Sequence, residues 1–214
     1  MMVANATGCS SIYGGSAPAT PYCRNYRSGF GPAWANSLFE DNAEFGLGMA
    51  TATRQMRDRV ERIMKEGLAC DCCSAEIKAL FTEWIANREN TLKTKEVADK
   101  LIPLIEACGS SFSASLSETA TGSFLHICKQ FLELRHSLVK KSQWIFGGDG
   151  WGYDIGFGGL DHVLASSEDV NVVVDTEVYS NTGGQSSPSR RKFSVVADLK
   201  SGAKYYKDVQ FEIQ

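Results

Sequence analysis

The sequence predicts an α/β fold, with a mostly parallel sheet flanked by helices and an α-helical insertion within it. In this 214-residue chain, residues 144–146 form a short apolar run that predicts a strand. Residues 147–150 (GGDG) predict a tight turn, in which glycine permits positive φ or close approach of a ligand. Residues 155–166 carry apolar side chains at helical spacing. Residues 170–174 are β-branched, which is typical of a buried parallel strand.

This strand–helix–strand unit has a consequence for its loops. A right-handed crossover places the loops that follow the two strands side by side, at the carboxyl ends of neighbouring strands. The first loop offers the carboxylate of Asp149, and the second offers the hydroxyl of Thr176, free carbonyls and the amide of Asn181. Those are the hard oxygen ligands that Mg²⁺ takes when it also binds a diphosphate. The glycine backbone and a helix amino terminus would face the anion.

The amino-terminal third contains two further segments of interest. Residues 2–4 resemble the end of a strand, and residues 5–18 form a Gly/Ser-rich loop of a length that usually serves a ligand. A single cysteine in such a loop, Cys9, is by itself most often a small buried thiol.

Residues 50–141 change character and predict amphipathic helices that pack on one another and on the sheet. Pro103 is expected to bend or end the third of these helices. The CDCC run at 70–73 lacks the second ligand pair that a tetrahedral metal site needs, and His126 and His136 do not supply one, so a structural role is favoured. The apolar positions that define the helices are Met56, Val60, Ile63, Met64, Ile77, Leu80, Phe81, Trp84, Ile85, Val97, Leu101, Leu104, Ile105, Phe124, Ile127, Cys128 and Phe131.

Composition excludes some classes of protein. A net charge of −3, a pI of about 5.7 and the absence of a basic stripe argue against nucleic-acid binding. No run of eighteen apolar residues predicts a membrane span, and the first residues do not resemble a signal peptide. Seven cysteines at irregular spacing favour a reducing compartment over a disulfide scaffold.

Longer strings carry a family resemblance. GGDGWGYDIGFGGLDHVLAS (147–166) and DTEVYSNTGGQSS (175–187) are similar to the thiamine diphosphate-binding domain of pyruvate:ferredoxin (flavodoxin) oxidoreductases. ATGCSSIYGGSAPATPY (6–22) and GPAWANSLFEDNAE (31–44) resemble segments that precede this motif in the same family. The resemblance therefore predicts that residues 1–214 are a partial thiamine diphosphate-binding domain, a fragment of the family's C-terminal domain, with 50–141 as its helical insertion.

The resemblance also implies metal ligands. Mg²⁺ would be bound by the Asp149 side chain, the Thr176 hydroxyl and the Val178 carbonyl. Cys9 would be one of four ligands to a [4Fe–4S] cluster, which only the complete enzyme could hold.

Cofactor-binding and catalytic roles follow from the same resemblance. Gly148, Gly150 and Trp151 would shape the diphosphate pocket, while Asn181 would reach thiamine diphosphate near the substrate and serve as a catalytic residue. His162 belongs to the similar string but is assigned no chemistry.

The implied activity is oxidative decarboxylation of pyruvate to acetyl-CoA and CO₂, with coenzyme A as co-substrate and ferredoxin or flavodoxin as electron acceptor. The implied partners are the rest of a larger parent polypeptide and a second subunit in a homodimer, without nucleic acid or membrane. The implied location is the cytoplasm or a hydrogenosome-like organelle. The 214-residue chain alone is expected to be inactive.

The sequence departs from the family pattern in places. Asp175 follows Asn171 by four positions, where the family has five, so either the loop 166–170 absorbs the slip or the Thr176 side chain is misdirected. The family's CxxC and late cysteine are absent, and after Gln185 only a strand at 193–197 is expected, with 190–192 a solvated basic loop.

Two other functions remain open. A non-redox thiamine enzyme, such as a decarboxylase or synthase, would share the GDG turn but not the ATGCSSI loop. A nucleotide-binding α/β module would also use a glycine turn before a helix, although neither GxGxxG nor GxxxxGK[ST] occurs.

Overall fold

The computed structural model describes residues 1–8, 24–27, 29–38, 40–70, 73–111, 118–176 and 193–198. The chain divides into two compact units, each described separately below. The first comprises Met1–Thr51 and Ser142–Gln214, and the second comprises Ala52–Lys141. The assignment of the first unit to a thiamine domain, with the second as an insertion, stays a prediction.

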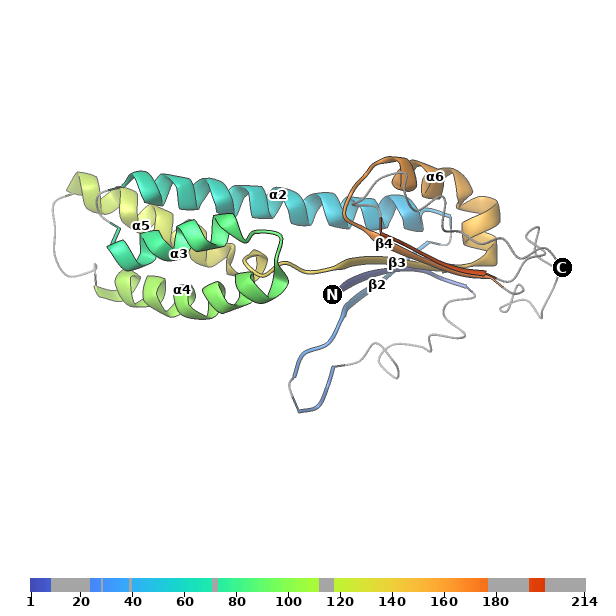
Figure 1. Ribbon diagram of the computed structural model, residues 1–214, viewed down its shortest axis with the longest axis horizontal. Coiled ribbons are helices and arrows are strands. Elements are labelled where there is room, and N and C mark those ends of the chain that lie inside the picture. The colour runs from blue at the N-terminus through green and yellow to red at the C-terminus, as the bar shows by residue number, and fades with distance from the viewer. Residues whose placement is uncertain are drawn as a thin grey trace. The chain divides into compact units, whose positions relative to one another are not determined.

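The first unit is built on a five-stranded sheet in the order β2-β1-β3-β4-β5 (Figure 1). Strands β1 to β4 are parallel, and β5 pairs antiparallel with β4. This arrangement confirms the predicted α/β class with a mostly parallel sheet, and β5 confirms the strand expected near 193–197. The bounds are β1 Met2–Ala6, β2 Ala33–Ser37, β3 Gln143–Gly148, β4 Asn171–Thr176 and β5 Phe193–Asp198.

One face of the sheet is covered by the start of α2 (Asn42–Ala69) and by α6 (Phe157–Ala165) (Figure 1). Their buried side chains and those of the strands form a single core, which comprises Ala4, Ala6, Ala43, Ala50, Ile145, Trp151, Leu160, Val163, Val170, Val172 and Val174. Helix α2 approaches the sheet closely at Gly46, where an added Cβ would overlap the side chain of Ile145.

The GGDG segment differs from the predicted turn. Strand β3 continues through Gly148, and helical conformation begins at Asp149, so no separate turn joins strand and helix. Gly150 has φ −64°, which any residue can adopt, so positive φ is not the reason for glycine there. The reason for glycine at 147 is packing: a Cβ on Gly147 would overlap the indole ring of Trp151.

The helix predicted at 155–166 is preceded by a second helical segment. A π-helical turn, η3 (Trp151–Ile155), precedes α6. Ile155, one of the apolar residues that define the predicted helix, is 58% exposed, whereas Trp151 is fully buried. The register shift of the π-helical turn explains the difference, because it changes which residues of the segment face the sheet.

The second unit consists of helices around a separate core, as the apolar spacing predicted. It contains the remainder of α2 with α3 (Ala75–Ala86), α4 (Thr91–Ser111), α5 (Glu118–Glu133) and the short η2 (Arg135–Ser137) (Figure 1). Trp84, Phe81, Phe131, Leu101 and Ile105 are among its most buried side chains. Among the residues that the structure describes, none of the helices has both the length and the apolarity needed to cross a membrane.

Pro103 does not end its helix. Helix α4 continues to Ser111, with Leu101 and Ile105 buried on either side of the proline. Pro103 itself is exposed, so its ring faces solvent while the apolar face of the helix stays packed. Tertiary packing on both sides compensates for the missing backbone donor.

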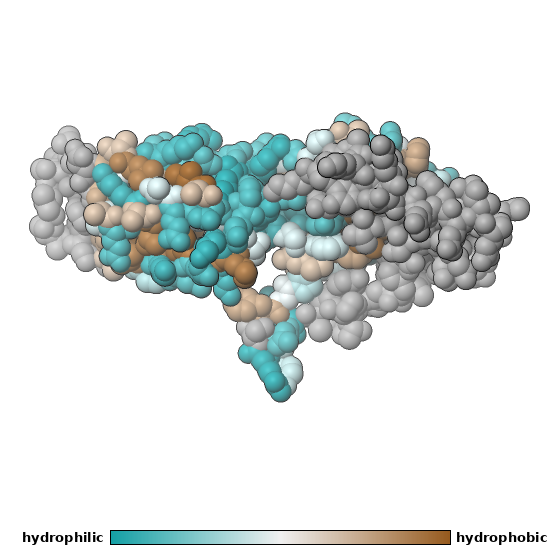
Figure 2. All heavy atoms as spheres, in the orientation of Figure 1, coloured by the Kyte–Doolittle hydropathy of each residue, from teal (hydrophilic) through white to brown (hydrophobic). Residues whose placement is uncertain are grey.

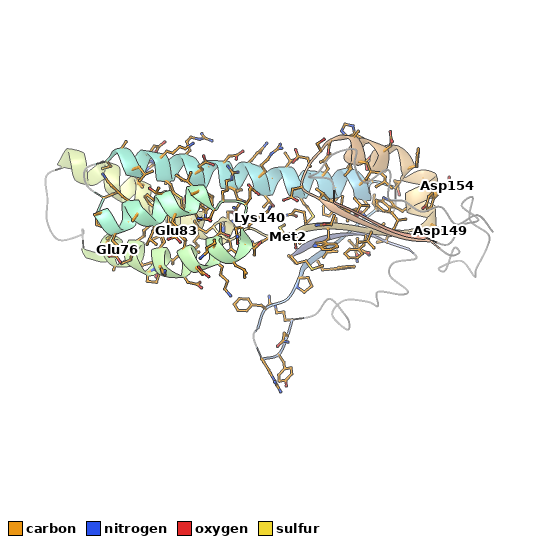
Figure 3. The ribbon with its side chains drawn as sticks, viewed as in Figure 1. Met2, Glu76, Glu83, Lys140, Asp149 and Asp154 are labelled. Atoms are coloured by element: carbon orange, nitrogen blue, oxygen red, sulfur yellow. The ribbon has the colours of Figure 1, made fainter. Side chains whose placement is uncertain are left out.

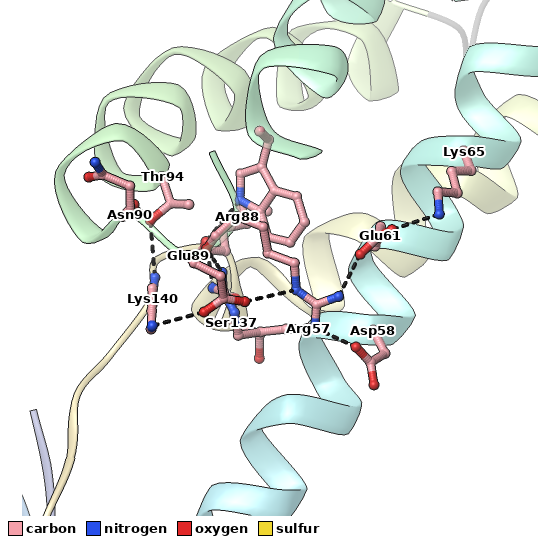
Figure 4. Close-up of polar contacts among 12 residues, drawn as sticks. Arg57, Asp58, Glu61, Lys65, Arg88, Glu89, Asn90, Thr94, Ser137 and Lys140 are labelled. Carbon is pink, nitrogen blue, oxygen red and sulfur yellow. Dashed lines mark hydrogen bonds and ion pairs between the residues drawn. The ribbon is translucent and has the colours of Figure 1, made fainter. Parts of the chain in front are cut away.

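A buried arginine, Arg57 on α2, connects several elements of the second unit (Figure 4). Its Nη1 donates to the carbonyls of Ser137 (3.1 Å) and Leu138 (3.0 Å), and its Nη2 donates to the carbonyl of Arg88. The guanidinium lies 5.1 Å from the centre of the Trp84 ring, a cation–π contact. Burial lowers the pKa of Arg57 to about 10, and the nearby carboxylates of Glu89 and Asp58 offset only part of this desolvation.

Arg57→Lys should lower the free energy of unfolding of the 214-residue chain by roughly 2 to 4 kcal/mol, because a lysine cannot reach all three carbonyls and leaves buried acceptors unpaired. Arg59→Lys, on the exposed side of the same helix, should change it by less than about 0.5 kcal/mol. Urea unfolding followed by circular dichroism measures both, and equal effects would contradict the role given to Arg57.

Two glycines on α2 provide a matched test of the packing on the sheet. Gly46→Ala should destabilise the chain by roughly 1 to 3 kcal/mol, because its Cβ overlaps Ile145 in a filled core. Gly48→Ala has no atom within 4 Å of its Cβ and should stabilise by up to about 1 kcal/mol through helix propensity. Thermal unfolding of both variants shows whether the signs differ as expected.

Candidate functional site

The carboxyl edge of the sheet holds the predicted acid. Asp149 follows β3 directly and is fully buried, at 0% exposure. Figure 3 shows it at the end of the sheet opposite Met2. Gly148 pairs with Asp175, so the next residues along the two strands, Asp149 and Thr176, come to the same edge. A carboxylate is costly to bury, so a fully buried acid at this edge of the sheet is a candidate ligand position.

The ladder between β3 and β4 also bears on the shortened spacing before Asp175. The two strands pair residue by residue from Trp144 opposite Asn171 to Gly148 opposite Asp175, with no bulge. The turn before β4 contains Ser167 with φ 57°, an uncommon conformation for a residue other than glycine. The backbone of Thr176 is thus placed by a regular ladder, and the direction of its hydroxyl stays a prediction.

Two polar side chains hold the edge of the sheet against helix α2. Asn42, the first residue of α2 and fully buried, donates from Nδ2 to the Phe146 carbonyl at 2.9 Å. The hydroxyl of Ser37, at the end of β2, donates to Asn42 Oδ1 at 2.7 Å. These two bonds connect the ends of β2 and β3 through one side chain. They hold the backbone of Phe146 in place, three residues before Asp149.

Trp151 lies beneath this edge and belongs to the core. Its ring packs against the backbone at Gly147 and Gly156, and a Cβ at either position would overlap it. Gly152 lies similarly close to Val174 on β4. Gly148 is the last residue of β3, and Gly150 is the second helical residue. The roles of Trp151, Gly148 and Gly150 in shaping a diphosphate pocket stay predictions.

The other predicted site residues fall outside the described part of the chain. Cys9, Val178 and Asn181 lie there, and for Thr176 only the backbone is described. The structure therefore brings Asp149 to the same edge as the Thr176 backbone, and it does not test the ligand roles. Asp154, an exposed acid on η3, lies near Asp149 in Figure 3 and was not singled out from the sequence.

The cysteines of the second unit do not form a metal site in the part of the chain that is described. No group of three His, Cys, Asp or Glu side chains there could hold a metal ion. Cys70 is disulfide-bonded, whereas Cys73, Cys108 and Cys128 are free thiols. Burial raises the pKa of Cys73, and it raises that of Cys128 to about 11, so both thiols stay protonated at neutral pH.

Sequence reasoning missed Asn5 and Asn42. Asn42 is a helix-start residue in an acidic segment, so its capping tendency could have been recognised. Asn5 is a polar residue in a strand that is otherwise apolar; it is fully buried, and its Nδ2 donates to Asn36 Oδ1 at 2.9 Å. Both side chains act across elements distant in sequence, which a linear pattern does not reveal.

Comparison with known proteins identifies relatives. No protein-family model matches the chain. Pyruvate-flavodoxin oxidoreductase of Klebsiella pneumoniae is 53% identical over 190 residues, which is 88% of this chain and 15% of that protein. Pyruvate:ferredoxin oxidoreductase of Moorella thermoacetica is 49% identical over 208 residues, 97% of this chain and 17% of that protein. Pyruvate dehydrogenase [NADP(+)] of Cryptosporidium parvum is 39% identical over 225 residues, 94% of this chain and 12% of that protein.

The α/β fold and these relatives place the chain in an oxidoreductase family. The chain belongs to the pyruvate:ferredoxin (flavodoxin) oxidoreductase family, as the resemblance of its motifs predicted. It spans between 12% and 17% of the length of these three relatives, so it corresponds to one segment of them.

Asn42→Ala should destabilise the 214-residue chain by about 1 to 2 kcal/mol, because the Phe146 carbonyl and the Ser37 hydroxyl each lose a buried partner. Gln55→Ala, at an exposed position further along the same helix, is the control and should have an effect below about 0.5 kcal/mol. Urea denaturation compares them, and an Asn42→Ala variant as stable as the control would remove Asn42 from this account.

Proposed function

We propose that this chain is the segment of a pyruvate oxidoreductase that anchors the diphosphate of thiamine diphosphate through Mg²⁺. The observation that carries the proposal is the fully buried Asp149 at the carboxyl edge of β3, next in register to Thr176. In open α/β sheets, ligands bind outside the carboxyl ends of the strands. The names of the relatives supply the substrate, pyruvate.

The residues present fit a magnesium–diphosphate site. Mg²⁺ is commonly held by one or two carboxylates, with phosphate oxygens and water completing its shell, so one buried acid suffices. Asp149 would supply the charge, and the Thr176 hydroxyl and Val178 carbonyl would supply neutral oxygens. Burial of Asp149 strengthens its attraction for the cation, because little water competes in that position.

When bound, thiamine diphosphate supplies the carbanion and the electron sink for loss of CO₂ from a 2-oxo acid. The chain's own residues hold and orient this cofactor. Gly148 and Gly150 would let the backbone approach the diphosphate, and Asn181 would contact the cofactor near the substrate. Cys9 would be one ligand of a [4Fe–4S] cluster that carries electrons away.

The relatives' names also suggest how functions are divided. They name flavodoxin, ferredoxin or NADP⁺ as acceptors, although all are similar to this one chain. We therefore infer that this segment serves the pyruvate half of the reaction and that the acceptor is selected elsewhere in a longer polypeptide. Coenzyme A, a ferredoxin or flavodoxin acceptor, a homodimeric state and a cytoplasmic or hydrogenosome-like location are proposed on the same basis. The 214-residue chain alone is proposed to be inactive.

Asp149→Asn should weaken Mg²⁺-dependent binding of thiamine diphosphate by at least about tenfold, because the isosteric amide removes the charge that holds the cation. Asp161→Asn removes the same charge from an exposed position on α6 and should leave affinity unchanged. Titration calorimetry of the full-length protein, with and without Mg²⁺, measures both. Equal affinities in the two variants would reject Asp149 as the ligand, and an absence of thiamine diphosphate binding in the unmutated protein would reject the proposed function.

A further inference from the structure

Four of the seven cysteines meet at the core of the second unit. Cys73 and Cys128 are buried members of this core, and Cys70 and Cys108 pack against it half-buried. Burial raises the pKa of Cys73 and of Cys128, and a thiolate at Cys108 would raise both further, so these sulfur atoms interact. Figure 2 shows apolar residues among the hydrophilic ones at the surface of this unit, as expected where half-buried members of the core reach the surface.

One member of this group is oxidised. Cys70 is disulfide-bonded, whereas Cys73, Cys108 and Cys128 are free thiols, so the partner of Cys70 lies outside the described part of the chain. The cysteine pattern of the sequence favours a reducing compartment, where disulfides are usually transient and serve catalysis or redox sensing. A disulfide beside free thiols can exchange with them without an external oxidant, because attack by a thiolate conserves the number of disulfides.

The backbone brings Cys73 close to Cys70. The two cysteines have the CxxC spacing, and the Cys73 N–H donates to the Cys70 carbonyl at 3.5 Å. A bond between residues three apart accompanies a Cα separation below about 7 Å, and a disulfide requires roughly 4.4 to 6.8 Å. Helix α2 ends at Ala69, and Ser74 caps the start of α3, so both cysteines lie between two helix ends. The backbone geometry therefore suits a Cys70–Cys73 disulfide.

We propose that residues 70–73 form a thiol–disulfide switch, in which the disulfide of Cys70 moves to Cys73. The Cys73 thiolate attacks the sulfur of Cys70, a Cys70–Cys73 bond forms, and the bond between Cys70 and its present partner breaks. The departing thiolate takes up the proton that Cys73 has lost, so no oxidant or reductant is consumed. The exchange releases one thiol and removes another, which changes the cysteine that a redox partner can reach.

Burial of Cys73 controls the exchange. Its side chain is 7% exposed, and burial raises its pKa, with the charge of Lys78 opposing this effect and Cys108 adding to it. Because the thiolate is the nucleophile, a protonated Cys73 attacks slowly at neutral pH. Opening of the segment or a higher pH increases the thiolate fraction and so speeds the transfer. The inference rests neither on the thiamine site nor on pyruvate turnover.

Isotope-coded alkylation of the full-length protein tests the proposal. The protein is kept anaerobic without reductant at about pH 7 or about pH 8.5. Free thiols are then blocked in denaturant with light N-ethylmaleimide, and disulfides are reduced and labelled with the heavy reagent. Tryptic peptide 66–78 contains both cysteines, and its fragment ions assign the label on each.

Cys70 should carry heavy label and Cys73 light label at the start. The heavy share at Cys73 should then rise at least about fivefold at the higher pH, and more slowly at neutral pH, because the thiolate fraction differs. The total heavy label per chain should stay constant. Cys128, which is buried in the same core, is the control and should keep its light label.

Substitutions identify the bond that forms. Cys70→Ser should prevent heavy label from appearing at Cys73, whereas Cys128→Ser should leave the transfer unchanged. Heavy label at Cys73 in the Cys70→Ser variant would assign its bond to a different cysteine and overturn the proposal. Light label at Cys73 throughout, or light label at Cys70 from the start, in the unmutated protein would also overturn it. A rise in total heavy label would indicate oxidation in place of exchange.

Discussion

The close contact between the Trp151 ring and the glycine backbone is the constraint on which the first unit depends. Only residues without a Cβ fit at Gly147 and Gly156, and with them the largest side chain of the core lies directly beneath the end of β3. The chain can then pass from strand to helix without a loop, which holds Asp149 at the edge of the sheet in a buried position. Packing thus fixes where the candidate ligand stands, before any cofactor is bound.

Each unit uses a buried polar side chain to bond backbone carbonyls of elements that are distant in sequence. Asn42 does so for Phe146 in the sheet unit, and Arg57 does so for Ser137, Leu138 and Arg88 in the helical unit. Buried backbone acceptors must be bonded, and a side chain that bonds one from a distant part of the chain fixes two elements together. These contacts give the units a defined geometry that apolar packing alone specifies less strictly.

Periodicity was sufficient to predict the strands near 144 and 172, the helices of the second unit and the parallel class of the sheet. It failed at the GGDG segment, because the signal that glycine gives for a turn is the same as the signal it gives for close packing. At Pro103 it left a bend or an end of the helix open, and the helix continues because tertiary contacts of Leu101 and Ile105 outweigh the local preference to end it. The hydrogen bonds of Asn5 and Asn42 could not be predicted from the sequence, since their partners are distant along the chain. The family was recognisable because its motifs extend over tens of residues.

The central claim is that Asp149 binds the divalent cation that holds a diphosphate at the carboxyl edge of the sheet. Crystals of the full-length protein grown with thiamine diphosphate and Mn²⁺ in place of Mg²⁺ would locate the cation by its anomalous scattering. The account predicts a single strong peak about 2.1 Å from a carboxylate oxygen of Asp149 and in contact with the diphosphate. A cation bound to the diphosphate but away from Asp149 would contradict it.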